Sequence, residues 1–278
     1  ILKVHVKGKP LDKDVDLSLL ARATPGFVGA DIENLVNEAA ILAARRDKKL
    51  IGKIEFEEAI ERVIAGPERK SRLINPDEKK IIAYHEAGHA IVIASLPEAD
   101  QVQKISIISR GLAAGYTIAL PEEDLTLMSR KKLLAQMSGL LGGRASEELV
   151  FNDITSGAAN DIENVTELAR KMITRLGMSS SLGPMVYGKK DELVFLGKEI
   201  GEQRDYSEAI AEKIDQEVQQ LVNNSYATAR KILVKYRSKL DEVANKLLES
   251  ETMTREEFET IFPIPKPKNH GIPKPTAA

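Results

Sequence analysis

The sequence predicts a mainly α-helical protein with one small β-hairpin or sheet. Three features of its 278 residues indicate this class. Apolar residues recur at helical spacing in several long segments. Only 4% of the residues are aromatic and 29% are charged, a composition typical of a helix-rich protein with many ion pairs. A single pair of short segments alternates apolar and polar residues, as half-buried strands do. A chain of this length favours two domains.

Composition also excludes several classes of function. The net charge of −2 gives no indication of binding to nucleic acid or to an anionic membrane surface. Cysteine is absent, which excludes disulfides and thiolate metal ligands and fits a reducing compartment. No apolar run approaches 18 residues, so we expect this region itself to be soluble. The chain begins at Ile1 without methionine, and we expect it to be part of a longer protein.

Residues 1–65 are predicted to form a small helical domain. We expect three helices, each with one apolar face, which start near Leu17, Ala30 and Glu55. The glycine-containing loop 24–31 precedes the second of these helices, and its simplest interpretation is a turn followed by a helix cap. The run 66–70 contains glycine, proline and charged residues and is predicted to be a linker.

The helix predicted over Asn75–Pro97 is the most informative part of the sequence. Asn75 can cap it and Pro76 suits its first position. Apolar residues surround the helix nearly completely, which indicates that it is buried. A buried helix that carries polar groups needs partners for them, because an unpaired buried charge costs several kcal/mol.

Two histidines and a glutamate lie on this helix in the arrangement His-Glu-x-x-His. His85 and His89 are four residues apart, so their rings lie on one face about 6 Å apart and can reach a single metal ion. Glu86 lies between them, where the glutamate of such a motif takes a proton from the attacking water. We therefore predict a zinc site with Glu86 as the general base. The alternative is that both histidines are ordinary core residues.

The third zinc ligand is left open by the residues alone. Without cysteine it must be a histidine, an aspartate or a glutamate. Asp161 lies on the apolar face of its predicted helix, although an ordinary capping role is equally compatible with its position. Glu148 and Glu147 are competing candidates. The remaining histidines, His5 and His270, lie near the ends of the chain.

Val102–Ile108 and Gly115–Leu120 are predicted to pair as a β-hairpin. Val102–Ile108 is a candidate edge strand that could pair with an extended peptide, and a hairpin that only covers the core is equally compatible with the pattern. Further helices are predicted over Ser129–Val150, up to Leu176, over Tyr206–Leu248 and after Thr254. The proline-rich tail 263–278 is expected to be disordered or polyproline-like.

Five motifs follow one another along the chain: TPGFVGADIENLVNEAA, IAGPERKS, IIAYHEAGHA, GGRASEELVF and TSGAANDIENVTELAR. Together they resemble the membrane-anchored AAA+ zinc metalloproteases of the FtsH type, over nearly the whole chain up to about Phe262. The resemblance implies that residues 1–65 are the helical lid of an ATPase module. It implies that residues 71–262 are a zinc metalloprotease domain, joined to the lid by the linker 66–70.

The resemblance also implies roles for individual residues. His85, His89 and Asp161 would be the zinc ligands and Glu86 the general base. Gly29 and Ala30 match the lid position that borders the nucleotide in the assembled ATPase. The family consists of hexamers of the inner membrane, with this region on the cytoplasmic side, which use ATP and Mg²⁺ to unfold soluble and membrane proteins and to thread them to the protease sites.

One departure from the family pattern limits what this chain can do alone. The sequence contains no G-x-x-x-x-G-K-[ST] motif, so ATP-driven unfolding is not expected of it. Two alternative functions remain. The first is an oligomerisation module with a structural metal, against which Glu86 argues, because a structural zinc needs no base and usually has four protein ligands. The second is a zinc hydrolase that acts on non-peptide substrates.

Overall fold

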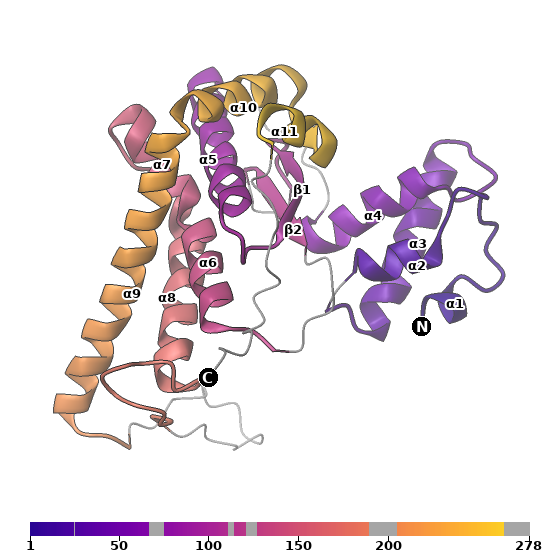
Figure 1. Ribbon diagram of the computed structural model, residues 1–278. Helices are drawn as coiled ribbons and strands as arrows, with labels where there is room; N and C mark the ends of the chain where they lie inside the picture. The colour runs from indigo at the N-terminus through magenta and orange to yellow at the C-terminus, as the bar shows by residue number, and fades with distance from the viewer. Residues whose placement is uncertain (25, 67–74, 111–113, 121–126, 189–204, 264–278) are drawn as a thin grey trace, which may run out of the picture. The chain divides into compact units, whose positions relative to one another are not determined.

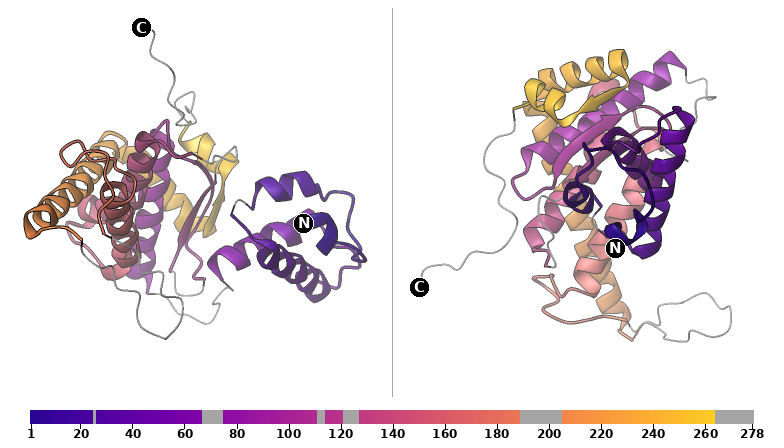
Figure 2. Two further views of the ribbon diagram at one scale, coloured as in Figure 1. Left: turned by 90° about the horizontal axis from the view of Figure 1, so that it is seen from below. Right: turned by 90° about the vertical axis from the view of Figure 1, so that its right-hand side faces the viewer.

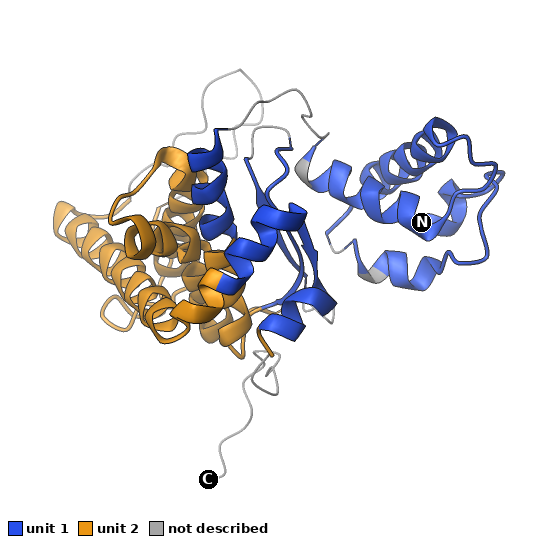
Figure 3. Ribbon diagram, turned by 90° about the horizontal axis from the view of Figure 1, so that it is seen from above, with its two compact units in different colours: residues 1–86, 100–126, 242–261 blue, residues 87–99, 127–241, 262–278 orange. Residues whose placement is uncertain are grey.

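The computed structural model describes residues 1–24, 26–66, 75–110, 114–120, 127–188 and 205–263 (Figure 1). These residues form helices and a single three-stranded antiparallel sheet, as the predicted fold class requires. The chain divides into two compact units (Figure 3). Unit 1 comprises residues 1–86, 100–126 and 242–261, and unit 2 the remainder. Among the described helices, none combines the length and apolar character that crossing a bilayer requires.

Four helices at the N-terminal end of unit 1 are α1 (Leu2–His5), α2 (Leu17–Arg22), α3 (Gly29–Arg45) and α4 (Lys53–Ala65). Helices α3 and α4 pack against each other, and their buried faces include Leu35, Val36 and Phe56. The three helices predicted in this region are confirmed, and α1 is an addition. Apart from Gly66, the predicted linker 66–70 lies outside the described residues.

Helix α5 (Pro76–Ser95) carries the predicted metal motif. Its start is set locally, because the Asn75 side chain accepts a hydrogen bond from the N–H of Asp77 at 3.1 Å. Its end precedes Pro97, as expected. Residues on several sides of the helix are fully buried, among them Ala83, Ala90 and Val92, which confirms the predicted burial.

The sheet of unit 1 contains β1 (Gln101–Ser106), β2 (Tyr116–Leu120) and β3 (Thr252–Thr254) in the order β2-β1-β3. Strands β1 and β2 pair antiparallel, as the predicted hairpin requires. Strand β3 was not predicted, and it pairs with the other side of β1. The prediction that Val102–Ile108 is an edge strand is therefore wrong, because β1 is the central strand and β2 lies at one edge of the described sheet.

Unit 2 is built around α9 (Glu208–Lys235), which packs against α6 (Arg130–Leu140), α7 (Gly142–Phe151) and α8 (Ala159–Thr174). Helix α9 lies along α8 (Figure 2). The segment predicted as one or two helices around Gly142 forms two, which meet at Leu141.

Helices α10 (Arg237–Ser250) and α11 (Arg255–Ile261) follow α9 in the chain, and residues 242–261 belong to unit 1. The proline-rich tail falls outside the described residues apart from Pro263.

Glycines bring α5 and α7 unusually close together. A Cβ atom added at Gly88 would lie 2.5 Å from the carbonyl oxygen of Gly142 and 2.6 Å from Cβ of Ser146. In the reverse direction, a Cβ added at Gly142 would lie 2.7 Å from the carbonyl oxygen of Gly88. All three separations are shorter than real Cβ contacts. One of the two x positions of His-Glu-x-x-His is thus restricted to glycine by packing.

Substituting Gly88 by alanine should lower the free energy of unfolding by about 1–3 kcal/mol, because the added methyl group meets backbone atoms that cannot move independently. The measurement is urea denaturation followed by circular dichroism. Gly29→Ala is the matched control, since a Cβ at Gly29 meets nothing within 4 Å. Its change should stay within about 0.5 kcal/mol. Equal effects of the two substitutions would contradict the packing argument.

Glu55, in the first turn of α4, is fully buried and bound by three donors. Its carboxylate accepts hydrogen bonds from Arg46 at 2.7 Å, from Lys48 at 2.9 Å and from the N–H of Gly52 at 3.1 Å. Burial raises the pKa of Glu55, but the hydrogen bonds from Lys48, Arg46 and Gly52 outweigh it and lower the pKa from 4.5 to about 2.

The four N-terminal helices should therefore lose stability in acid. Because the folded-state pKa of Glu55 is depressed, its contribution is fully present above pH 4.5 and is lost as the pH falls toward 2. The loss should be about 1–3 kcal/mol, reduced by the solvent exposure of Arg46 and Lys48. Hydrogen exchange of α3 and α4 amides at pH 6 and pH 3 measures it. Glu55→Gln should flatten this pH dependence, and an unchanged dependence in that variant would refute the assignment.

Candidate metal centre

The structure brings the three predicted metal ligands together. His85 and His89 lie on one face of α5, and each is 8% exposed. Asp161 lies in the first turn of α8, and its side chain is 17% exposed. One ligand atom from each of the three residues lies within 4.8 Å of the other two. Within the described part of the chain this is the one group of three such residues found at that spacing.

The ring of His89 is oriented by the main chain of α6. Its Nδ1 lies 2.8 Å from the carbonyl oxygen of Gly139, to which an Nδ1–H group donates. That hydrogen bond selects the tautomer in which Nε2 keeps its lone pair. Nε2 in turn lies 3.4 Å from Oδ2 of Asp161. Nε2 and the carboxylate oxygen are both ligand atoms of the kind that zinc accepts.

The spacing of His89 and Asp161 is the one expected around a tetrahedral zinc ion. Two ligand atoms that each lie about 2.0–2.2 Å from such an ion are separated by about 3.3–3.5 Å. The 3.4 Å separation between His89 and Asp161 already has this value. Two imidazoles and one carboxylate leave the fourth position open, which is the arrangement of catalytic rather than structural zinc sites.

The competing ligand candidates have other partners. Glu147 is buried, and its Oε2 accepts a hydrogen bond at 2.7 Å from the N–H of Thr155, just ahead of the turn that leads into α8. Glu148 is exposed and accepts a hydrogen bond from the hydroxyl of Tyr226 on α9. Glu147 thus supports the loop that delivers Asp161 to the site, a role that sequence reasoning missed.

Glu86 is 6% exposed and faces the start of β2. Its Oε2 accepts a hydrogen bond from the hydroxyl of Thr117 at 2.8 Å. Sequence reasoning gave Thr117 no role, because a threonine in a strand carries no signal of its own. The partner of Glu86 is visible only once the strand and the helix are placed together.

The predicted nucleotide-bordering residues begin α3. Gly29 and Ala30 are its first two residues, and the carboxylate of Asp31 accepts a hydrogen bond from the N–H of Val28 at 2.9 Å. Gly26 has a positive φ of 79°, and a capped helix follows it in the described part of the loop. The role of Gly29 and Ala30 beside a nucleotide stays a prediction. His5 lies in α1, and His270 lies outside the described residues.

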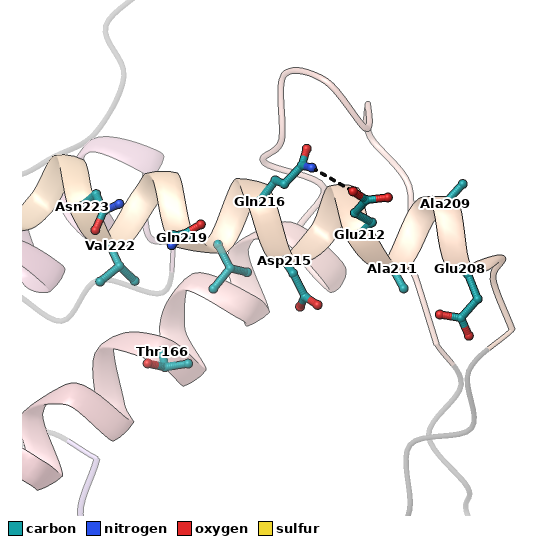
Figure 4. A pocket seen from close by; sticks show the side chains of 11 residues that line it. Thr166, Glu208, Ala209, Ala211, Glu212, Asp215, Gln216, Gln219, Val222 and Asn223 are labelled. Atoms are coloured by element: carbon teal, nitrogen blue, oxygen red, sulfur yellow. Dashed lines mark hydrogen bonds between the residues drawn. The ribbon is translucent and has the colours of Figure 1, made fainter.

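A hollow of about 880 Å³ lies along α8 and α9 (Figure 4). It is open and lined mainly by polar side chains, such as Glu208 and Asp215, and the amide of Gln216 donates to Glu212 at 3.4 Å. None of its lining residues belongs to the candidate metal centre. The hollow and the candidate metal centre are therefore separate features of the chain.

Comparison with known families decides what the chain is related to. Residues 72–261, more than half of the chain, match the model of peptidase family M41. The chain belongs to peptidase family M41. Residues 14–58 match the model of the AAA+ lid domain. The resemblance to FtsH-type proteases, recognised from five motifs, is thereby confirmed.

Two relatives show how far the similarity extends. An ATP-dependent zinc metalloprotease FtsH 1 of Thermomicrobium roseum is 56% identical over 275 residues, which are 99% of this chain and 42% of the relative. An ATP-dependent zinc metalloprotease FtsH of Thermotoga maritima is 58% identical over 263 residues, which are 94% of this chain and 43% of the relative. This M41 chain therefore spans about two fifths of the length of the curated relatives it matches.

Zinc affinity should depend on Asp161. Removing a residue that hydrogen-bonds to a metal ligand lowers metal affinity about 10–100-fold. Asp161→Ala removes a ligand itself, so it should lower zinc affinity at least about 100-fold. Titration of zinc against a chromophoric chelator measures this. Glu163→Gln, an exposed change in the same helix, and Glu148→Gln should both retain the affinity of the unchanged chain. Retained affinity in Asp161→Ala, or its loss in Glu148→Gln, would overturn the ligand assignment.

Proposed function

We propose that this chain is the proteolytic part of an ATP-dependent, membrane-anchored zinc protease and acts as a zinc-dependent endopeptidase. One observation carries the proposal. His85, His89 and Asp161 place their ligand atoms within 4.8 Å of one another in a chain of peptidase family M41, and Glu86 directly follows the first ligand. The printed names of the relatives, ATP-dependent zinc metalloproteases, support the choice of metal and of reaction.

The residues divide the work of peptide hydrolysis among them. His85, His89 and Asp161 hold the metal ion. When bound, zinc supplies Lewis acidity that polarises the peptide carbonyl and makes a water molecule easier to deprotonate. Glu86 takes a proton from that water as the water attacks the carbonyl carbon. Glu86 then delivers this proton to the leaving amine.

Substrate binding is proposed to use the edge of the sheet. Strand β2 lies at one edge of the described sheet, and its residues are partly exposed along its whole length. An unfolded polypeptide could add there as a further strand through main-chain hydrogen bonds. This mode accepts many sequences, because the main chain is common to all of them, and it suits an enzyme that degrades unfolded soluble or membrane proteins.

The rest of the machinery is proposed for the full-length protein. Residues 1–65 would be the ATPase lid, 66–70 the linker and 71–262 the protease domain, a division that the family matches over 14–58 and 72–261 support. Gly29 and Ala30 would border ATP, with Mg²⁺, in the complete ATPase. The full-length protein would form a homo-oligomer, a hexamer, in the inner membrane, with this region on the cytoplasmic side.

Glu86→Gln should abolish cleavage of an unfolded, fluorescence-quenched polypeptide while zinc remains bound. The loss of the general base should reduce turnover at least about 100-fold. His85→Phe should lose both zinc and cleavage, because it removes a ligand. Chelation should stop cleavage by the unchanged chain, and added zinc should restore it. An active Glu86→Gln variant, or cleavage that survives complete removal of zinc, would contradict the proposed function.

A further inference from the structure

The hydroxyl of Thr117 contacts the residue proposed as the general base. Oγ1 lies 2.8 Å from Oε2 of Glu86 and 3.2 Å from the backbone carbonyl oxygen of Glu86. A hydroxyl has one proton to donate, and the carboxylate is both the nearer and the stronger acceptor, because a hydrogen bond to a charged group is shorter and stronger. Thr117 therefore holds one of the two carboxylate oxygens.

Gly115 lies against the other carboxylate oxygen. A Cβ atom added there would lie 2.8 Å from Oε1 of Glu86, 2.9 Å from its Cγ and 2.9 Å from the carbonyl oxygen of Ser106. The side chain of Glu86 thus lies against Gly115 and the start of β2, with the Thr117 hydroxyl at one oxygen and the main chain of Gly115 near the other.

The start of β2 is itself held in place by a buried cluster. The hydroxyl of Tyr116 and the guanidinium of Arg110 each donate to Oε2 of Glu61 at 3.0 Å, and Lys104 pairs with Oε1 of the same carboxylate. Arg110 is 2% exposed and Glu61 8%. Burial, and then the charge of Glu61, raise the pKa of Tyr116, so its hydroxyl stays protonated and remains a donor. Thr117 follows a residue that is fixed in this way.

We propose that Thr117 is a positioning residue of the peptidase, whose hydroxyl fixes the orientation of the Glu86 carboxylate for proton transfer. The inference rests on the proposed function. A glutamate side chain has three rotatable bonds, and proton transfer requires the carboxylate within about 2.6–3.2 Å of the water. The hydrogen bond from Thr117 to Oε2 restricts those rotations. Misplacing a catalytic group by about 1 Å can cost about 100-fold in rate.

Thr117→Val removes the hydroxyl and keeps the shape of the side chain. It should lower kcat about 10–100-fold, with KM and zinc affinity unchanged, because the metal ligands are unaltered and the main chain of β2, proposed to hold the substrate, is kept. Thr117→Ser restores a donor and should recover kcat to within about threefold. Thr228→Val is the matched control, since its hydroxyl donates only to the carbonyl of Asn224 on the exposed surface of α9 and its kcat should not change.

A double-mutant cycle separates positioning from a general structural effect. In the Glu86→Gln background, Thr117→Val should cause little further loss of kcat, because the carboxylate that it orients is gone. An undiminished loss in that background would overturn the inference, as would an unchanged kcat in Thr117→Val or a failure of serine to restore it.

Crystal structures of the zinc-bound chain with threonine and with valine at position 117 test the inference independently of activity. Glu86 should occupy one orientation in the first and several in the second. The same single orientation in both would overturn the inference even if kcat fell. Absence of zinc-dependent cleavage by the unchanged chain would instead count against the proposed function, and the two crystal structures would still decide whether Thr117 orients Glu86.

Discussion

Burial of α5 is the constraint on which the rest of the site depends. His85, Glu86 and His89 are each less than 9% exposed, and polar groups at that depth need partners. The surroundings supply them: the carbonyl of Gly139 at His89 and the hydroxyl of Thr117 at Glu86. The two imidazoles and the carboxylate of Asp161 together offer three ligand atoms to one cation. Glycines around the motif make these contacts possible, because α7 and β2 approach α5 where a Cβ would collide.

The fold could be predicted wherever its signal was local. Helix α5 begins where Asn75 caps it. Helix α11 begins after Thr254, whose N–H donates to the carboxylate of Glu257 at 2.9 Å and whose hydroxyl accepts from the N–H of Glu257 at 3.4 Å. Strand β3 had no such signal. It is three residues long, and its partner β1 lies about 150 residues earlier in the sequence. Because β3 was not predicted, β1 was predicted to be an edge strand. The order of strands in a sheet depends on pairings between distant segments, which a local sequence pattern does not indicate.

The site was predictable to the extent that it lies within one helix. Four-residue spacing places His85 and His89 on one face, whatever surrounds them. Helical periodicity placed Asp161 toward the core and made it the best candidate, but it could not separate a metal ligand from an ordinary capping acid, and only the family resemblance favoured the ligand. The hydroxyl that binds Glu148 belongs to Tyr226, 78 residues away. Supporting groups such as the carbonyl of Gly139 have no sequence signature, because every residue has a carbonyl.

The central claim is that this chain holds one catalytic zinc ion, bound by two histidines and one aspartate. Anomalous scattering at the zinc edge, from crystals of the chain grown with zinc, tests it most directly. We expect one peak about 2.0–2.2 Å from a nitrogen of each imidazole and from a carboxylate oxygen of Asp161, with Glu86 outside bonding distance. A peak that includes Glu86 as a ligand, or a peak elsewhere with none between these three residues, would contradict it.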